Sequence, residues 1–260
     1  MGPILKVDNL SKVFLRGGQQ SVTAVKNVSF ELMPGECLGV LGESGSGKTT
    51  MVSMITRLLD VTVGQIILDG QNITNLRGKE LRSVYRKMQM VFQTPADSFD
   101  PRKTLGDGIG ESLRNVGMSR RETRAEVERL LEQCELSKKF ADRYPHQVSG
   151  GQCQRAAIAR ALAIQPKLLI CDEATSALDV TVQKEIIDLL NQLRLAQGKH
   201  LSILFICHDL SLVQQFCDRV LVMYQGEIVE QGTHSELMSM HGRYAHMYDE
   251  FINKEMRDRV

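Results

Sequence analysis

The segment GESGSGKTT, residues 42–50, has the residue types and spacing of a phosphate-binding loop. It fits the pattern G-x-x-x-x-G-K-[ST], with Gly42, Gly47, Lys48 and Thr49 at the defined positions. Glycine is needed because backbone N–H groups must approach phosphate oxygens closely, in conformations that a Cβ atom would obstruct. Lys48 would bridge the β- and γ-phosphates of a nucleotide, and the Thr49 hydroxyl would bind Mg²⁺. Alone, the loop predicts only phosphate binding, because kinases and GTPases share it. The predicted nucleotide contacts here are Gly42, Glu43, Ser44, Gly45, Ser46, Gly47, Lys48, Thr49 and Thr50.

Two adjacent carboxylates follow an apolar run later in the chain. In LLICDE, residues 168–173, Asp172 and Glu173 come at the end of an expected buried strand. Open α/β sheets bind their ligands beyond the carboxyl ends of such strands. Asp172 would help to hold Mg²⁺, and Glu173 would orient and polarise the attacking water as a general base. Taken alone, Asp172 and Glu173 could simply be the solvent-exposed end of a strand. The phosphate loop earlier in the chain favours the catalytic interpretation.

The segment QVSGGQCQRAAIARALAIQP, residues 147–166, predicts a helix whose first turn could bind an anion. Ser149 is a good N-cap, Gly150 and Gly151 leave the first turn exposed, and Pro166 is expected to end the helix. A helix N-terminus with bare amides attracts phosphate. Since the chain already has a phosphate loop, this second clamp makes physical sense if it reaches a nucleotide held by another subunit. The spacing alone does not establish that arrangement.

The motifs and their order resemble those of the ABC ATPase family. VSGGQ, residues 148–152, is similar to the LSGGQ signature of that family. Gln93 in MVFQ resembles the Q-loop glutamine, Asp179 at the end of SALD resembles the D-loop aspartate, and His208 in FICHD resembles the switch histidine. The match covers nearly the whole chain.

This resemblance implies a head-to-tail dimer with two composite sites for ATP and Mg²⁺. Each site would combine the phosphate loop of one chain with Ser149, Gly150, Gly151 and Gln152 of the other. Gln93 would contact Mg²⁺ and the attacking water and would sense a membrane partner. His208 would contact the γ-phosphate and help to place Glu173, while Asp179 would communicate between the two sites. Phe14 in SKVF is the candidate for stacking on adenine.

A more specific resemblance concerns MVFQTPADSFDPRKT, residues 90–104, and HDLSLV, residues 208–213. Both are similar to ATPase subunits of dipeptide, oligopeptide and nickel importers. Asp100 stands where asparagine is usual, and the tail lacks the HPYT segment of the peptide subgroup, so it is closer to some nickel or metal-chelate subunits. The cargo stays open between peptides and metal chelates. The implied partners are two membrane permeases, a second ATPase subunit, with a heterodimer favoured, and indirectly an extracytoplasmic binding protein.

Several short apolar runs are expected to form the strands that position these residues. The early runs, with turns at Gly35 and Gly70, indicate antiparallel pairing, and the later runs alternate with helical patterns around a parallel sheet. Residues 95–165 predict helices, one with Val127, Leu130, Leu131 and Cys134 on a single stripe. The expected strands are Ile4–Val7, Val28–Leu32, Leu38–Leu41, Gln65–Leu68, Leu168–Cys171, Ile203–Cys207 and Val220–Met223.

We therefore expect an α/β fold, a P-loop NTPase core with a parallel central sheet. An N-terminal antiparallel β subdomain and an inserted α-helical subdomain would complete it. Residues 1–260 would form one ABC ATPase domain, with residues 1–94 and 166–260 as the ATP-binding core and residues 95–165 as the helical subdomain carrying the signature motif.

Composition narrows the possible functions. The 260 residues are 42% apolar, and 32 Lys and Arg nearly balance 31 Asp and Glu, so no large positive charge is available to neutralise nucleic acid. The six cysteines form no CxxC pair and are expected to be structural, in a reducing cytoplasm.

No segment approaches the ~20 apolar residues needed to span a bilayer, and the N-terminus lacks a secretion signal. A membrane role would run through a partner, with the chain peripheral on the inner face of the cell membrane.

Three alternatives come from other functional classes. An ABC-type ATPase of translation or DNA repair would usually show tandem cassettes, long coiled-coil insertions or basic patches, which are missing from this sequence. A different phosphate-loop enzyme, such as a small-molecule kinase, leaves VSGGQ, SALD and His208 without a role. A catalytically inactive interaction subunit is disfavoured by the intact Glu173 and His208.

Overall fold

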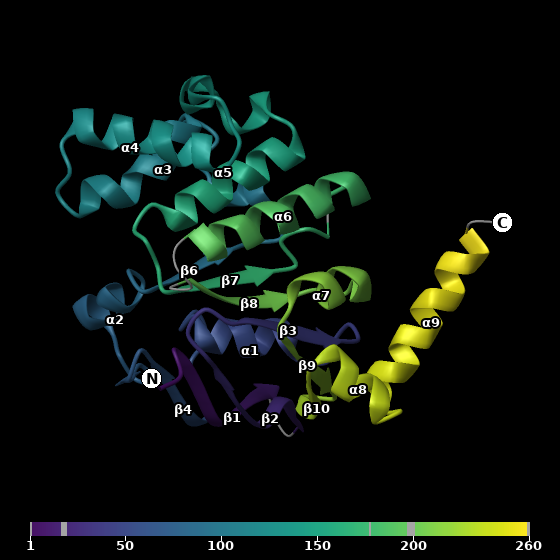
Figure 1. Cartoon of the computed structure of the whole chain (residues 1–260). Coiled ribbons are helices and arrows are strands. Elements are labelled where there is room, and N and C mark those ends of the chain that lie inside the picture. The colour runs from purple at the N-terminus through teal and green to yellow at the C-terminus, as the bar shows by residue number, and fades with distance from the viewer. Residues whose placement is uncertain (1, 17–19, 177, 197–200, 259–260) are drawn as a thin grey trace.

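The computed structural model describes residues 2–16, 20–176, 178–196 and 201–258, and their strands form two sheets (Figure 1). The central sheet has the order β10-β9-β3-β8-β7-β6, in which all neighbours are parallel except the edge strand β10. The second sheet, β2-β1-β4-β5, is antiparallel. The predicted combination of a parallel core and an early antiparallel sheet is confirmed. The strands are β1 (Leu5–Arg16), β2 (Gln20–Leu32), β3 (Cys37–Gly42), β4 (Val63–Leu68), β5 (Gln71–Asn72), β6 (Met88–Val91), β7 (Leu168–Asp172), β8 (Ser202–Ile206), β9 (Arg219–Tyr224) and β10 (Glu227–Gly232).

Only helices and turns connect β6 to β7, and the long helices among them gather at one end of the molecule (Figure 1). The predicted stripe on α4 is confirmed, since Val127, Leu130, Leu131 and Cys134 are all buried. The division of the chain at residues 95 and 165 stays a prediction. The helices are α1 (Lys48–Ile55), α2 (Gly78–Val84), α3 (Leu105–Asn115), α4 (Arg120–Gln133), α5 (Gly150–Leu162), α6 (Val180–Ala196), α7 (Leu210–Phe216), α8 (His234–Ser239) and α9 (Arg243–Asp258), with the short 3-10 helices η1 (Pro95–Ser98), η2 (Lys138–Asp142) and η3 (Pro145–Gln147).

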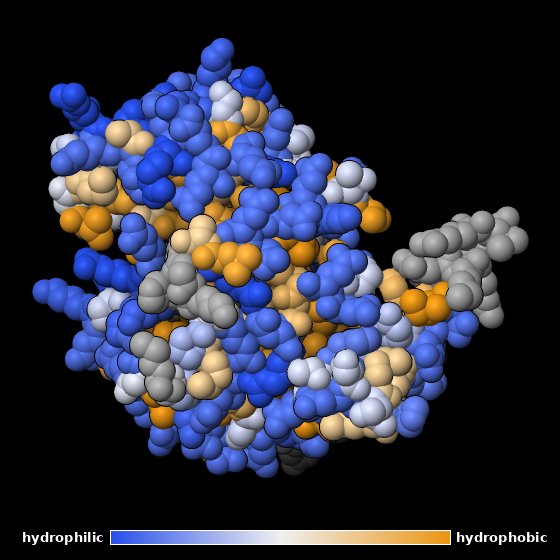
Figure 2. Space-filling model, in the orientation of Figure 1, coloured by the Kyte–Doolittle hydropathy of each residue, from blue (hydrophilic) through white to orange (hydrophobic). Residues whose placement is uncertain are grey.

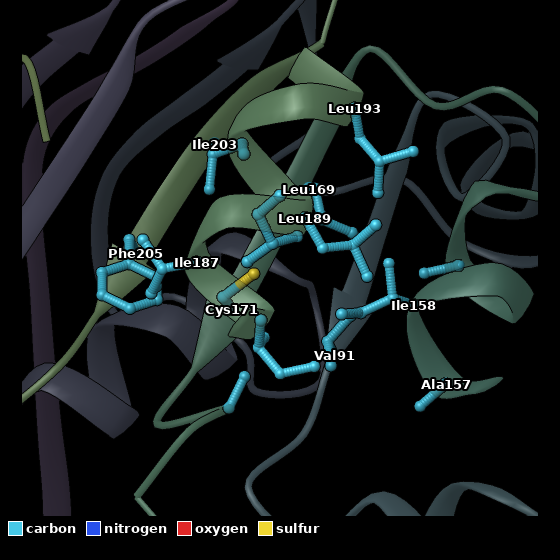
Figure 3. Close-up of a cluster of buried hydrophobic side chains, with 14 of the residues drawn as sticks. Val91, Ala157, Ile158, Leu169, Cys171, Ile187, Leu189, Leu193, Ile203 and Phe205 are labelled. Carbon is cyan, nitrogen blue, oxygen red and sulfur yellow. The ribbon is translucent and has the colours of Figure 1, made fainter. Parts of the chain in front are cut away.

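Side chains alternate between two hydrophobic cores on opposite faces of the central sheet. Leu169 and Cys171 of β7 pack with Ile203 and Phe205 of β8 against α5 and α6 (Figure 3). Their neighbours along the strands, such as Ile170, belong to the other core, which includes α1 and the antiparallel sheet. Because both faces are covered, these strands are continuous apolar runs, as is typical of parallel sheets. Polar residues cover most of one face of the molecule, with apolar residues exposed in small groups (Figure 2).

Some expected boundaries were wrong. The apolar pattern of Met54, Ile55 and Leu58 predicts a helix through Leu58 after the phosphate loop. Helix α1 ends at Ile55, and Leu58 lies beyond it with 64% of its surface exposed. Helix α5 ends at Leu162, four residues before Pro166, because the chain turns through Gln165 at φ 51°. Strands β1 and β2 extend well beyond the predicted runs as a long hairpin. None of the described helices combines the length and the hydropathy that crossing a bilayer requires.

Candidate active site

Four adjacent parallel strands end at the residues that carry the predicted chemistry. Strand β3 leads into the phosphate loop, and β7 ends at Asp172. His208 comes two residues after β8, and Gln93 two residues after β6. The strand register places Asp172 beside Ile206 and Val91 beside Cys171, so these ends lie at one edge of the sheet. This is where an open α/β sheet binds its ligand.

The phosphate loop folds around the ammonium group of Lys48. Its Nζ donates hydrogen bonds to the carbonyl oxygens of Gly42 at 2.7 Å and Glu43 at 2.9 Å. Burial lowers the pKa of Lys48, and the nearby carboxylates of Glu173 and Asp172 oppose that shift. The cation is therefore already held at the centre of the loop, at the N-terminus of α1, where anion binding is favourable.

Two glycines of this loop cannot carry a side chain without moving the backbone of other strands. A Cβ atom on Gly42 would lie 2.4 Å from the carbonyl oxygen of Met223 in β9. A Cβ atom on Gly47, whose φ is 102°, would lie 2.5 Å from the carbonyl oxygen of Ala24 in β2. Close packing against two neighbouring strands thus adds to the requirement that the amides remain accessible to phosphate.

Glu173 and His208 form a direct contact, with 2.5 Å between Glu173 Oε1 and His208 Nε2. Glu173 has a left-handed backbone conformation with φ 49°, and its N–H donates to the carbonyl of Ile206 at 3.0 Å. A non-glycine residue in this conformation stores strain that the surrounding structure must compensate, as is common at functional sites. The carbonyl of Ile206 in β8 therefore holds the backbone of Glu173, and His208 contacts its carboxylate.

The carboxylate of Asp172 has an unused oxygen in a position suited to a cation. Its Oδ1 atom is buried and has no hydrogen-bond partner. Burial raises the pKa of Asp172, the neighbouring Glu173 carboxylate raises it further, and Lys48 opposes the shift. A divalent cation would compensate this buried negative charge, so the residues fit Mg²⁺. Among the described residues no cluster of three or more His, Cys, Asp or Glu side chains could hold a metal ion.

The structure adds Ser176, which the sequence analysis did not single out. Gln93 Nε2 donates to Ser176 Oγ at 3.1 Å, and this hydroxyl donates to the carbonyl oxygen of Glu173 at 3.0 Å. Gln93 is thus connected to the turn that carries Glu173. The only sequence signal was the position of Ser176 at the start of SALD. Ala177 of that motif lies outside the described residues, and Asp179 is exposed just before α6.

The helix α5 begins with the predicted N-cap. Ser149 Oγ accepts a hydrogen bond from the N–H of Gln152 at 3.3 Å, and Gln152 Oε1 accepts one from the N–H of Ser149 at 3.0 Å. A Cβ atom on Gly151 would lie 2.6 Å from Val182 Cγ1, because α6 passes close by. Gly150 and Ser149 are exposed, so the first turn of α5, with amides that have no intrahelical partner, faces outward.

Phe14 lies near the end of β1, and 39% of its surface is exposed. The ammonium group of Lys12 lies 5.3 Å from the centre of its ring. The ring is therefore accessible for stacking, and its role as the adenine platform stays a prediction.

Comparison with known proteins identifies the family. The model of the ABC transporter family matches residues 25–176, more than half of the chain. The chain belongs to the ABC transporter ATPase family. The oligopeptide transport ATP-binding protein OppF of Streptococcus mutans serotype c is 43% identical over 236 residues, 90% of this chain and 76% of that protein. OppF of Escherichia coli K12 is 46% identical over 220 residues, 84% of this chain and 65% of that protein. The chain thus spans between about two thirds and three quarters of the length of these relatives.

Solved structures support the same assignment. The ATP-binding cassette MJ0796, a dimer in a post-hydrolysis state bound to ADP and Pi, has a TM-score of 0.80 and 33% identity, with 88% of this chain and 98% of that chain covered. The structure of cbiO1 from Clostridium perfringens, part of the ABC transporter complex cbiONQ, has a TM-score of 0.81 and 28% identity, with 92% of each chain covered. The predicted family and fold are confirmed, and this ABC-family chain is an ATPase.

Proposed function

We propose that this chain is the ATP-hydrolysing subunit of an ABC importer and that Glu173 is its general base. The observation that carries this proposal is the contact between Glu173 and His208, next to Asp172 and Lys48 at the edge of the sheet. A carboxylate at this position can accept the proton of a water aligned with the terminal phosphate. His208 keeps Glu173 oriented and presents its ring toward the same space.

The other site residues bind the nucleotide. Lys48 exchanges its loop carbonyl partners for phosphate oxygens when ATP enters, which offsets the cost of its burial. Thr49, Asp172 and Gln93 would hold Mg²⁺, which neutralises charge on the transferred phosphoryl group. Gln93 must leave Ser176 to do so, so its contact with Ser176 belongs to the nucleotide-free state.

We also propose that two subunits close over ATP. The outward-facing first turn of α5, from Ser149 to Gln152, offers the amides of Gly150 and Gly151, which the capping box does not use, to a phosphate held by the loop of another subunit. Asp179, exposed in front of α6, would contact the partner and link the two sites. The dimeric form of the similar cassette MJ0796 supports this arrangement.

The importer would require two permeases, which this chain contacts at the inner face of the membrane. A cavity of about 180 Å³ between β6 and α5 is lined by Leu58, Tyr85, Phe92 and Arg160, among others. Leu58 and Phe92 expose 64% and 41% of their surfaces, and Phe92 precedes Gln93 directly. A permease segment in this groove would therefore act on the Q-loop, coupling transport to hydrolysis.

We propose that the cargo is a peptide, on the basis of the two OppF relatives. A second ATPase subunit and an extracytoplasmic binding protein would complete the system. Asp100, where this importer group usually has asparagine, is paired with Arg102 at 3.1 Å and leaves the local turn intact. Calorimetric titration of the cognate binding protein with short peptides and with nickel chelates tests the cargo. Binding of nickel chelates alone would replace the peptide proposal.

The experiment for the catalytic proposal is Glu173→Gln, which removes the charge of the base and keeps its size. We expect ATP turnover to fall by about 10²–10⁴-fold, with ATP binding retained and with Mg·ATP driving dimer formation in light scattering. Glu132→Gln, an exposed change on α4, is the matched control and should behave as wild type. Normal turnover by the Glu173 variant would refute the role of Glu173. A variant that stays monomeric with Mg·ATP, alone and with the natural second subunit, would refute dimer closure.

A further inference from the structure

Two cysteines lie next to each other at the end of the central sheet that is remote from the active site. The Sγ atoms of Cys37 and Cys217 are 3.8 Å apart. Cys37 is the fully buried first residue of β3, and Cys217, directly after α7, is partly exposed. The phosphate loop begins at the other end of β3, about 16 Å along the strand. Neither thiol has a part in the nucleotide chemistry described above.

Hydrogen bonds join the start of β3, at Cys37, to the segment after α7, at Asp218. The N–H of Cys37 donates to Asp218 Oδ2 at 2.7 Å, and the N–H of Asp218 donates to the carbonyl of Cys37 at 2.8 Å. Arg194 donates to the same carboxylate oxygen at 2.5 Å. Gly39 leaves room for the second sulfur, since a Cβ atom there would lie 2.9 Å from Cys217 Sγ. The sulfur atoms, 3.8 Å apart, would have to approach to the ~2.05 Å of a disulfide.

We propose that Cys37 and Cys217 form a redox-active pair that closes to a disulfide when the protein meets a low-molecular-weight disulfide such as oxidised glutathione. The thiolate of Cys217 attacks one glutathione sulfur, the glutathione S–S bond breaks, and one glutathione thiolate leaves. The thiolate of Cys37 then attacks Cys217 Sγ, and the second glutathione leaves as its thiolate. The protein loses two electrons and two protons, and one oxidised glutathione becomes two reduced molecules.

The order of the two attacks follows from exposure. Cys217 is partly exposed, whereas Cys37 is fully buried. Burial raises the pKa of the Cys37 thiol well above its ordinary value, so little of its thiolate is present near neutral pH. Cys217 therefore reacts first, and ring closure by Cys37 is the slower step.

The bond would join residues 180 positions apart and fasten the start of β3 to the segment that leads into β9. A cross-link over so long a loop restricts the unfolded chain strongly, so the oxidised protein should melt at a higher temperature. The phosphate loop lies at the opposite end of β3, so affinity for ATP should change by less than about twofold. Under oxidising conditions the disulfide between Cys37 and Cys217 would thus cross-link two segments of the core.

The test uses the full-length protein, reduced, freed of reductant and incubated with oxidised glutathione. Intact mass should decrease by about 2 Da relative to the reduced protein, as expected for a disulfide. Peptide mapping without reductant should join the Cys37 peptide to the peptide that contains Cys217, and dithiothreitol should reverse both changes. A melting temperature several degrees above that of the reduced protein is expected.

Matched variants assign the bond, because Cys207 lies in the same tryptic peptide as Cys217. Cys217→Ser should abolish the cross-link, while Cys207→Ser should keep it. Melting curves of the reduced variants confirm that both are folded. A glutathione adduct on Cys217 that never closes, a cross-link that survives in Cys217→Ser, or an oxidised protein that melts no higher would each overturn the proposal.

Discussion

Replacing Asp172 with asparagine should make the nucleotide-free protein more stable while it abolishes Mg²⁺-dependent turnover. In the folded protein, burial and the Glu173 carboxylate raise the pKa of Asp172 despite the opposing charge of Lys48. Because the pKa of Asp172 is raised overall, desolvation and repulsion by Glu173 must exceed the attraction to Lys48. The ionised carboxylate therefore destabilises the fold, and a neutral side chain of the same shape removes that cost.

The size of the effect follows from the single unpaired oxygen. Asp172 Oδ1 is buried without a hydrogen-bond partner, and the residue as a whole is half-buried. Asparagine still places a polar atom here, but leaving a charged group unpaired costs more than leaving a neutral one, and we take the difference as about 1–2 kcal/mol. For a chain of this size each kcal/mol changes the melting temperature by about 2–4 °C. We expect Asp172→Asn to melt about 2–8 °C higher than wild type.

The pH dependence gives the sign of the effect an independent check. A raised folded-state pKa opposes folding above that pKa, and the opposition disappears below the ordinary carboxyl value of 3.8, where both states are protonated. The difference between variant and wild type, measured by calorimetry without nucleotide, should therefore be largest at about pH 7.5 and shrink as the pH falls below the raised pKa toward 3.8. Asp188→Asn, on the exposed face of α6, is the control and should stay within about 0.5 kcal/mol of wild type.

With Mg·ATP bound, the wild-type protein should be more stable than the Asp172→Asn variant, the reverse of the order without nucleotide. A ligand at about 100 times its Kd stabilises the protein by about 2.7 kcal/mol, and the variant would lose the part of this gain that depends on Mg²⁺. ATPase activity of the variant should be near background. If folded Asp172→Asn melted at or below the wild-type temperature without nucleotide, the account of a buried, unpaired charge awaiting a cation would be refuted.

Three further changes test other parts of the site. Gly42→Ala forces a Cβ atom to within 2.4 Å of a β9 carbonyl; it should cost about 1–3 kcal/mol of stability and weaken ATP binding, measured by denaturant unfolding and by nucleotide fluorescence. His208→Ala frees the Glu173 carboxylate, so turnover should fall by about 10²-fold or more with nearly unchanged ATP affinity; an equal loss of affinity would count against an orienting role. Ser176→Ala removes the hydroxyl that holds Gln93, and basal turnover should rise without a change in nucleotide affinity.

The sequence was sufficient to predict most of the chemistry because each motif specifies its own local structure. The phosphate loop between β3 and α1, the capped start of α5 and the acidic end of β7 all occur where the patterns indicated. Strands β6 and β10 were not predicted. Residues 88–91 mix methionine and glutamine, and β10 alternates exposed and half-buried residues at an edge, so neither forms an apolar run. Pairing with β7 and β9 decides their structure, and that information is non-local.

Features that depend on contacts between distant segments were also beyond the sequence. The link from Gln93 through Ser176 to Glu173 joins residues 83 positions apart at its first step. The positive φ of Glu173 occurs together with its hydrogen bond to β8, and no residue type signals it. The close approach of Gly42 to the Met223 carbonyl of β9 adds a steric need for glycine that the motif alone does not indicate. Residue types thus indicate the reaction, and the strand order determines which residues act together.

One half of the proposed composite site lacks a cation and the other half lacks an anion. This explains why one subunit should not be sufficient for ATP hydrolysis. On the catalytic edge, Asp172 has an unpaired buried oxygen, and Lys48 is held by carbonyl groups of its own loop. On α5, the first turn presents amide donors that no intrahelical acceptor can use. A nucleotide with its metal supplies the cation that the first half lacks and the anion that the second half lacks. Since this turn is exposed at Gly150, the gain from pairing its remaining amides with phosphate is realised only when another molecule brings its nucleotide there. ATP binding and dimer closure should therefore be one energetic event.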